Sequence, residues 1–266
     1  MQIALLQIDI IKENKQANLQ RAEELLAGLS QEVRLVILPE MFNTGFSMYP
    51  ERIAEDENGP TLAWLITMVK KYKISIICSI SYAYMKYYFN RLFFVFTDGS
   101  YQTYDKRHLF HYLKEDEHYT AGTKRLIVDY EDWRICPQIC YDLRFPVWSR
   151  NSSPKAAEKP YDLLIYIANW PSMRMQPWNL LLQARAIENQ SYVIGLNRTS
   201  TDLSLTGERS FSGESQVIDF KGNIMAKAAL HKEEVLVVDL DLQSLHEYRA
   251  NFPVLMDGDE FTIENI

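Results

Sequence analysis

Three side chains that can cooperate in nucleophilic catalysis each follow a strand-like run of this sequence: Glu40, Lys106 and Cys140. Cys140 ends the apolar run 135–140, and the turn-forming stretch 141–146 follows it. A side chain at such a strand-to-helix corner stands above the sheet, where a nearby cation or a helix N-terminus can ionise a thiol and make it a nucleophile. Most free cysteines are instead small hydrophobic core residues, so position alone leaves both interpretations of Cys140 open.

Glu40 and Lys106 offer the groups that a thiol nucleophile needs. Glu40 closes the aliphatic run 34–38 among apolar neighbours, a setting typical of a general base, although a loop acid paired with a lysine gives the same pattern. Lys106 follows the run 101–105 among aromatic residues, where an ammonium can stabilise an oxyanion and lower the pKa of a neighbouring thiol. A surface lysine after a strand is the alternative.

Composition excludes several classes of protein. The 266 residues carry 28 Lys and Arg against 35 Asp and Glu, a net charge of −7, without a basic run, so nucleic acid is not an expected partner. No apolar stretch reaches the roughly 18–20 residues of a membrane-spanning helix, so no membrane is expected either. The first residues lack a signal-peptide pattern and the three cysteines are an odd number, which together predict a cytoplasmic location. Cys78 and Cys136 are expected in the core.

One cluster could suggest a metal site, namely His108, His111 and His118 with the acidic residues 115–117. Its spacing matches no zinc-binding pattern, and HExxH is absent. Glycine-rich phosphate-binding motifs and the GxSxG motif of serine hydrolases are absent as well. We therefore place the histidine cluster on a solvated loop or behind an active site.

Strand-like and helix-like stretches alternate along the chain, with hairpins between them. The predicted strands are 2–10, 34–38, 74–82, 161–168, 192–197 and 234–240. The predicted helices are 15–29, a helix that begins after 61 and ends at 72, and 179–189. The predicted hairpins span 91–105, 126–140 and 215–228. Two sheets covered by helices would account for this mixture. No linker or repeat divides the sequence, so we predict a single domain over residues 1–266.

Four motifs, in this order, resemble those of the nitrilase, or carbon–nitrogen hydrolase, superfamily: 38–42 (LPEMF), 104–110 (YDKRHLF), 139–146 (ICYDLRFP) and 183–189 (QARAIEN). The resemblance covers nearly the whole chain, and four ordered motifs are far more specific than any one of them. It implies an α/β fold class with mixed sheets, built as a four-layer α-β-β-α sandwich. It also implies a Glu-Lys-Cys triad that works without metal or organic cofactor, and a homodimer.

The resemblance assigns its triad to the three side chains above and implies a second active-site glutamate after the lysine motif. Glu115 is the better match, and Glu117 is the alternative two residues further on. In the implied mechanism the thiolate attacks an amide carbonyl to form a thioester, while Lys106 and the backbone N–H of Tyr141 hold the oxyanion. Glu40 would protonate the departing ammonia and then activate water, and Glu115 would orient the lysine.

The string 140–146 and the later 168–171 are similar to the omega-amidase branch of the superfamily. Members of that branch hydrolyse the terminal amide of short 2-oxo acid amides such as 2-oxoglutaramate. A substrate with a free carboxylate needs a cation in the pocket, and Arg174 is the candidate, with a surface arginine as the alternative. Phe42 and Trp170 are candidates for the pocket wall, with aromatic core packing as the alternative.

Other functions use the same residues. The same triad would serve a hydrolase of carbamoyl compounds, of other amides or of nitriles. A non-catalytic interaction module on this fold is expected to have a broken triad, whereas all three residues are present here. The spacing of Cys136 and Cys140 is not CxxC, which disfavours a thiol redox role.

Overall fold

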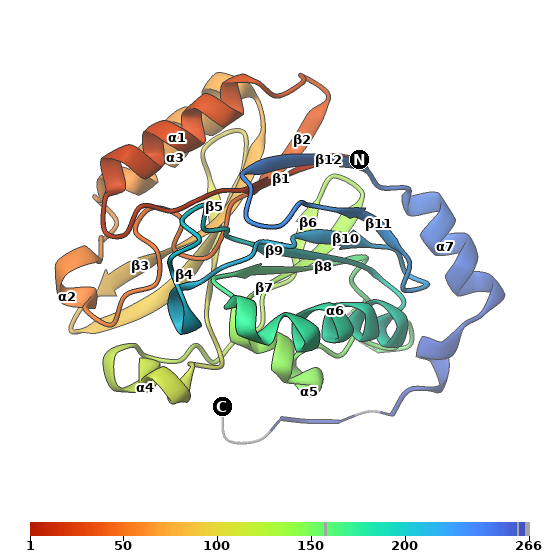
Figure 1. The fold of residues 1–266 in the computed structure, drawn as a ribbon. Coiled ribbons are helices and arrows are strands. Elements are labelled where there is room, and N and C mark those ends of the chain that lie inside the picture. The colour runs from red at the N-terminus through yellow and green to blue at the C-terminus, as the bar shows by residue number, and fades with distance from the viewer. Residues whose placement is uncertain (157–158, 260, 264–266) are drawn as a thin grey trace.

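Two six-stranded sheets form the centre of the computed structural model, which describes residues 1–156, 159–259 and 261–263 (Figure 1). The first sheet contains, in spatial order, β12 (Glu234–Asp239), β1 (Gln2–Gln7), β2 (Val33–Ile37), β3 (Ser75–Tyr84), β4 (Tyr87–Val95) and β5 (Tyr101–Asp105). The second contains β11 (Ile224–Lys227), β10 (Gln216–Ile218), β9 (Tyr192–Asn197), β8 (Leu163–Ala168), β7 (Trp133–Ile139) and β6 (Val128–Tyr130). Strands β1 to β3 and β7 to β9 are parallel, and the other neighbours pair antiparallel.

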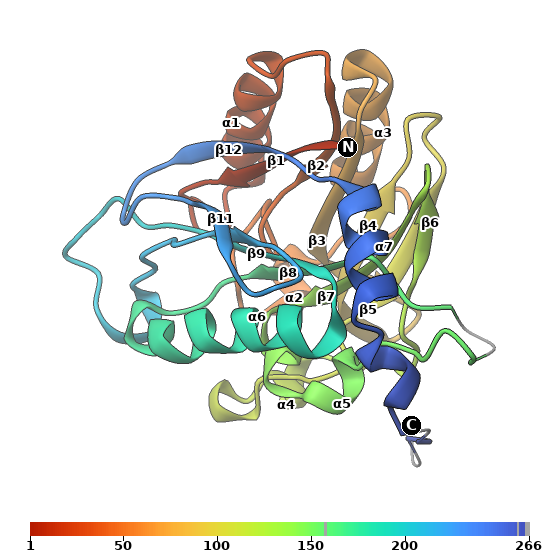
Figure 2. The same ribbon diagram turned by 90° about the vertical axis from the view of Figure 1, so that its right-hand side faces the viewer.

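Helices cover the outer face of each sheet, which gives four layers (Figures 1 and 2). The longer helices are α1 (Lys15–Ala27) and α3 (Pro60–Tyr72) beside the first sheet, α6 (Met175–Asn189) beside the second, and α7 (Leu242–Asn251) near the C-terminus. The short helices are α2 (Pro50–Ile53), α4 (Glu115–His118) and α5 (Pro146–Ser149). No helix in the described part of the chain is long and apolar enough to span a membrane. The predicted four-layer α-β-β-α sandwich is confirmed.

The alternation of side chains along β1 separates two cores. Ile3 and Leu5 point between the sheets, into the same buried cluster as Ile165 of β8. Ala4 and Leu6 point the other way, into the cluster that α1 and α3 cover. Successive side chains of a strand face opposite sides, so a strand that is apolar at every position can serve both layers.

Helix α1 shows how local sequence sets an element's limits. The Asn14 side chain accepts a hydrogen bond from the N–H of Ala17 and caps the start of the helix. Asn18, Ala22 and Leu26 recur every four residues and form the buried face. The helix stops at 27, two residues before the predicted end.

Three other boundaries differ from the predictions. Strand β1 ends at Gln7, before the predicted 10, and strand β4 of the 91–105 hairpin begins at Tyr87, before the predicted 91. Helix α6 begins at Met175, four residues before the predicted 179. Pro177 hides that start in the sequence, although proline is tolerated in the first turn of a helix.

Candidate active site

Cys140 directly follows β7 and begins the short 3-10 helix η2 (Cys140–Arg144). Its φ of 45° lies in the left-handed region, which costs a non-glycine residue about 1–3 kcal/mol. The chain turns sharply here, and the side chain lines a pocket while the residue as a whole is only 9% exposed. The corner that the sequence predicts is therefore present, with a 3-10 helix after the strand.

A buried carboxylate, that of Asp142, holds this corner. It accepts hydrogen bonds from the N–H of Ile139 at 3.0 Å, the hydroxyl of Tyr104 at 2.7 Å and the N–H of His108 at 3.0 Å. Tyr104 and His108 lie on either side of Lys106, so one carboxylate fixes the lysine segment relative to the cysteine corner. Asp142 was not singled out from the sequence; an acid directly after the cysteine corner, in a turn rich in aromatic and apolar residues, is the signal that could have found it.

Lys106 lies just after β5 and is 1% exposed. Its Nζ donates to Oε1 of Glu40 at 3.0 Å and to Oε2 of Glu115 at 2.9 Å. Burial by itself lowers the pKa of Lys106, but the two carboxylates outweigh burial and raise that pKa above its ordinary value. The side chain is therefore held as an ammonium.

Glu40 follows β2 and is fully buried, with hydrogen bonds to both carboxylate oxygens. Its Oε1 accepts from Lys106 and from Nδ2 of Asn90 at 2.7 Å, and its Oε2 accepts from the backbone N–H of Asn169 at 2.8 Å. The Ser79 hydroxyl donates to Oδ1 of Asn90 at 3.0 Å, which fixes the orientation of that amide. Neither asparagine was singled out from the sequence; Asn90, inside the apolar strand β4, carried the clearer signal.

The two glutamates after the lysine motif differ in their surroundings. Glu115, the first residue of α4, is fully buried and contacts Lys106; it also accepts a hydrogen bond from the N–H of Phe110 at 2.6 Å. Burial raises the pKa of Glu115, and the charge of Lys106 opposes that effect. Glu117 is exposed and pairs with a surface lysine. Of the two, Glu115 is the one that contacts the buried lysine.

The electrostatics of the cysteine differ from the sequence expectation. Burial raises the pKa of the Cys140 thiol well above its ordinary value, and the negative charge of Glu40 adds to the increase. The charge of Lys106 and the backbone N–H of Asn169 lower the pKa of this thiol, but by less than burial and Glu40 raise it. The charge of Lys106 has a limited effect on the pKa of the thiol, because two carboxylates already pair with that charge. Burial therefore favours the neutral thiol of Cys140 over the thiolate.

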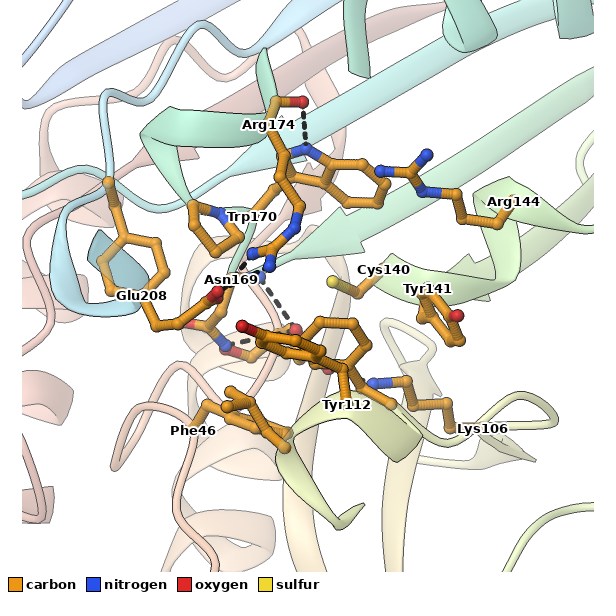
Figure 3. A pocket seen from close by; sticks show the side chains of 15 residues that line it. Phe46, Lys106, Tyr112, Cys140, Tyr141, Arg144, Asn169, Trp170, Arg174 and Glu208 are labelled. Carbon is orange, nitrogen blue, oxygen red and sulfur yellow. Dashed lines mark hydrogen bonds and ion pairs between the residues drawn. The ribbon is translucent and has the colours of Figure 1, made fainter. Parts of the chain in front are cut away.

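These groups meet at a pocket of about 270 Å³ (Figure 3). Cys140, Lys106 and Glu40 all line it. Aromatic side chains form much of the remaining wall: Phe46, Phe110, Tyr112, Tyr141, Trp170 and Phe211. Small-molecule sites commonly measure about 300–1,000 Å³, so a cavity of this size suits a short linear substrate.

One of the two predicted wall residues lies elsewhere. Trp170 lines the pocket, but Phe42 is fully buried beside Trp64, with ring centres 5.9 Å apart, in the core under α1 and α3. The wall position belongs to Phe46. The cause is a turn at Met41, whose φ of 46° directs the next side chain into the core before the chain returns to the pocket.

Arg174 lines the pocket and is already paired. Its guanidinium forms two contacts of 2.6 Å with the carboxylate of Glu208, one from each terminal nitrogen. It also lies 5.5 Å and 5.2 Å from the ring centres of Phe110 and Tyr112. No local pattern in the sequence marks Glu208 as the partner of Arg174, because the two residues are 34 positions apart along the chain.

The histidines near the lysine motif take structural positions. Nδ1 of His108 lies 2.8 Å from Asp142, and His111 is exposed and lies beside Asp116. Across the described ranges, no group of three or more His, Cys, Asp or Glu side chains is arranged to hold a metal ion.

The two sheets, the corner cysteine and the buried lysine between two carboxylates define a class of hydrolase, and sequence comparison identifies it. The sequence model of the carbon–nitrogen hydrolase family matches residues 2–250. The chain is 40% identical over 263 residues to omega-amidase YafV of Yersinia enterocolitica, covering 99% of this chain and 98% of the relative. It is 30% identical over 258 residues to 2-oxoglutaramate amidase of Bacillus subtilis strain 168, covering 96% of each. The chain belongs to the carbon–nitrogen hydrolase family, as its four motifs predicted.

Solved structures agree with this membership. XC1258 from Xanthomonas campestris, a CN-hydrolase superfamily protein with an arsenic adduct in its active site, has a TM-score of 0.93 at 39% identity, covering 99% of this chain and 98% of that one. Nit3 from Saccharomyces cerevisiae, a member of branch 10 of the nitrilase superfamily, has a TM-score of 0.82 at 28% identity, covering 96% and 94%. The fold is therefore that of the nitrilase superfamily.

Proposed function

We propose that this protein is a cysteine-dependent amidase that hydrolyses the terminal amide of short 2-oxo dicarboxylic acid monoamides, such as 2-oxoglutaramate, to the acid and ammonia. One observation carries the proposal: a thiol (Cys140), an ammonium (Lys106) and a carboxylate (Glu40) line one small pocket. The relatives named omega-amidase and 2-oxoglutaramate amidase, at 40% and 30% identity, support the substrate class.

In the first half-reaction Glu40 acts as the base. It takes the proton of the Cys140 thiol as the sulfur attacks the amide carbonyl, because the raised pKa of that thiol leaves little thiolate at neutral pH. Lys106 and the backbone N–H of Tyr141 stabilise the oxyanion; an N–H in the first turn of a helix has no partner within the helix. Glu40 then gives its proton to the nitrogen, the carbon–nitrogen bond breaks, and ammonia leaves a thioester on Cys140.

The second half-reaction repeats the proton transfers with water. Glu40 removes a proton from water, whose oxygen attacks the thioester carbonyl, and the same two donors hold the new oxyanion. The carbon–sulfur bond breaks, the sulfur regains the proton from Glu40, and the carboxylic acid leaves. No step needs a metal or an organic cofactor.

Glu115 is a positioning residue in this proposal. It accepts hydrogen bonds from Nζ of Lys106 and from the N–H of Phe110, so it holds the ammonium in place. The pair of carboxylates also keeps the lysine charged, as oxyanion stabilisation requires. Glu115 itself transfers no proton.

We extend the proposal to the organisation of the enzyme. Residues 1–266 act as one catalytic domain, which the family match to residues 2–250 supports. The enzyme works in the cytoplasm, which the odd number of cysteines supports. Resemblance to the superfamily supports a homodimer, and analytical ultracentrifugation of the full chain would test that state.

The decisive experiment measures ammonia release by purified wild type and Cys140→Ala. The substrates are 2-oxoglutaramate, glutamine, a carbamoyl amine and a simple nitrile. Rapid release from 2-oxoglutaramate alone, lost in the variant, is the expected result. Undiminished release by Cys140→Ala, with its fold verified by circular dichroism, would refute the thiol mechanism.

The same panel separates the proposal from the runner-up function, in which the triad acts on another carbon–nitrogen bond. Carbon dioxide released together with ammonia would identify a carbamoyl compound as substrate, and turnover of the nitrile would identify a nitrilase in the narrow sense. Silence on all four substrates would favour a non-catalytic module on this fold.

A further inference from the structure

The pocket contains two arginines that differ in what they contact. Arg174 is bound on both terminal nitrogens by Glu208, and the rings of Phe110 and Tyr112 flank it. One carboxylate matches its one positive charge, in the two-pronged geometry that guanidinium groups prefer. Arg174 therefore links three loops around the pocket and offers little free charge to a ligand.

Arg144 has different surroundings. It is the last residue of η2, the helix that Cys140 begins, and its side chain lines the same pocket (Figure 3). Its guanidinium lies 5.0 Å from the ring centre of Trp170. Among the described residues, none forms a hydrogen bond or ion pair with this guanidinium, which carries five N–H donors.

We propose that Arg144, and not Arg174, binds the carboxylate at the end of the substrate opposite the scissile amide. The inference rests on the proposed function and adds the residue that determines substrate class. Contact with the ring of Trp170 restrains the guanidinium plane, and its N–H edge is available for a two-pronged contact with a carboxylate. This choice differs from the sequence expectation, which favoured Arg174.

The two ends of η2 carry the thiol and the proposed anchor. Cys140 begins this five-residue helix and Arg144 ends it, and both residues line the same pocket. A substrate bound between them would present its amide to Cys140 and its carboxylate to Arg144.

The test compares two substrates of nearly equal shape. One is 2-oxoglutaramate, and the other is 4-oxopentanamide, in which a methyl group replaces the carboxylate. Three variants are measured on both: Arg144→Gln, Arg144→Lys, and Arg174→Gln as the matched control. Loss of a charge-assisted contact worth about 1.5–3 kcal/mol corresponds to about a 10- to 150-fold change in affinity.

For Arg144→Gln we expect KM for 2-oxoglutaramate to rise about 10- to 150-fold, with kcat changed far less and 4-oxopentanamide turned over as by wild type. Arg144→Lys should recover part of the loss, because it keeps the charge and loses the two-pronged geometry. Arg174→Gln should change KM for both substrates by the same factor. An unchanged KM for 2-oxoglutaramate in Arg144→Gln, or an equal loss on both substrates, would overturn the inference.

A binding measurement separates this inference from the proposed function. The product-like probe 2-oxoglutarate is tested for protection of Cys140 against iodoacetamide, which needs no turnover. Protection of wild type and of Arg174→Gln, but not of Arg144→Gln, supports the anchor even if 2-oxoglutaramate proves not to be hydrolysed. If wild type is not protected, or Arg144→Gln is protected equally, the inference fails whatever the amidase assay shows.

Discussion

Two charged clusters share this pocket, and their surroundings differ. The deep cluster, Glu40, Lys106 and Glu115, is 0–1% exposed, with nitrogen–oxygen distances of 2.9–3.0 Å. In the mouth cluster, Arg174 with Glu208, the nitrogen–oxygen distance is shorter, at 2.6 Å, but the two side chains are 22% and 23% exposed. The shorter contacts therefore belong to the cluster that water reaches.

Burial, more than distance, decides what each cluster contributes. Breaking a buried ion pair leaves a charge without solvent or partner, which costs about 3–5 kcal/mol. A pair that water reaches contributes about 0–1 kcal/mol, because solvent and salt screen it. In the proposed mechanism the deep cluster supplies the chemistry, and its burial predicts that it also contributes a large share of local stability, whereas the mouth cluster shapes access to the pocket.

The largest effect is expected from Lys106→Met, which removes the ammonium between two buried carboxylates. Ammonia release should fall to background, and the free energy of unfolding should fall by about 3–5 kcal/mol, as measured by urea denaturation. The double variant Lys106→Met/Glu115→Gln is the matched control, because it removes one of the stranded charges. It should regain stability without regaining activity; full stability in the single variant would contradict the account of the deep cluster.

A smaller effect is expected from Asn90→Leu, which removes the amide that orients Glu40. Loss of this hydrogen bond to a buried carboxylate should lower kcat about 10- to 100-fold, with KM for 2-oxoglutaramate nearly unchanged. Steady-state kinetics of the purified variant give both constants. Ser79→Ala, one step further from the carboxylate, should lower kcat less; a larger loss in Ser79→Ala would reverse the proposed order of contacts.

The thiol itself gives a prediction about pH. Because the raised pKa of Cys140 keeps the acid form, its thiolate should appear only above pH 9, the ordinary value for a thiol. At pH 8 iodoacetamide should therefore modify Cys140 more slowly than an unperturbed thiol, because a smaller fraction of Cys140 is thiolate at that pH. Mass spectrometry of the peptide that contains Cys140 follows the reaction. Rapid modification with a plateau below pH 8 would show that the lysine dominates after all.

The smallest effect is expected at the mouth. Glu208→Gln removes the partner of Arg174, and the melting temperature should stay within about 4 °C of wild type, because about 1 kcal/mol corresponds to a shift of about 2–4 °C. Differential scanning calorimetry at low and high salt measures this shift. A loss as large as that of Lys106→Met would remove the distinction between the clusters.

The sequence predicted the elements whose signal is local. The strand predicted at 2–10, the helix predicted from 15 and the corner after β7 depend on neighbouring residues, and the motifs around Glu40, Lys106 and Cys140 are each contiguous. The contacts that orient Glu40, Lys106 and Cys140 could not be predicted from neighbouring residues. Asn90, Asn169 and Asp142 act through partners far away in the chain, so only the packing of the two sheets reveals their roles.

Phe42 and Arg174 show that a residue predicted from local sequence can be turned away or paired by a contact that the local sequence does not reveal. Each lies in the expected neighbourhood, but a single left-handed residue turns Phe42 into the core, and a carboxylate from a distant loop pairs with Arg174. Residue type and position along the chain are equally consistent with Arg144 and Arg174 as carboxylate ligands. The difference lies in their partners, which the sequence does not encode locally.

The most direct test of the account is to mix wild type with excess 2-oxoglutaramate, quench with acid within the first turnover and determine the mass of the intact protein. The account predicts a species heavier by the substrate minus ammonia, with the added mass on the peptide that contains Cys140, and no such species in Cys140→Ala. Hydrolysis by Cys140→Ala at the wild-type rate, without a covalent adduct in either protein, would contradict it.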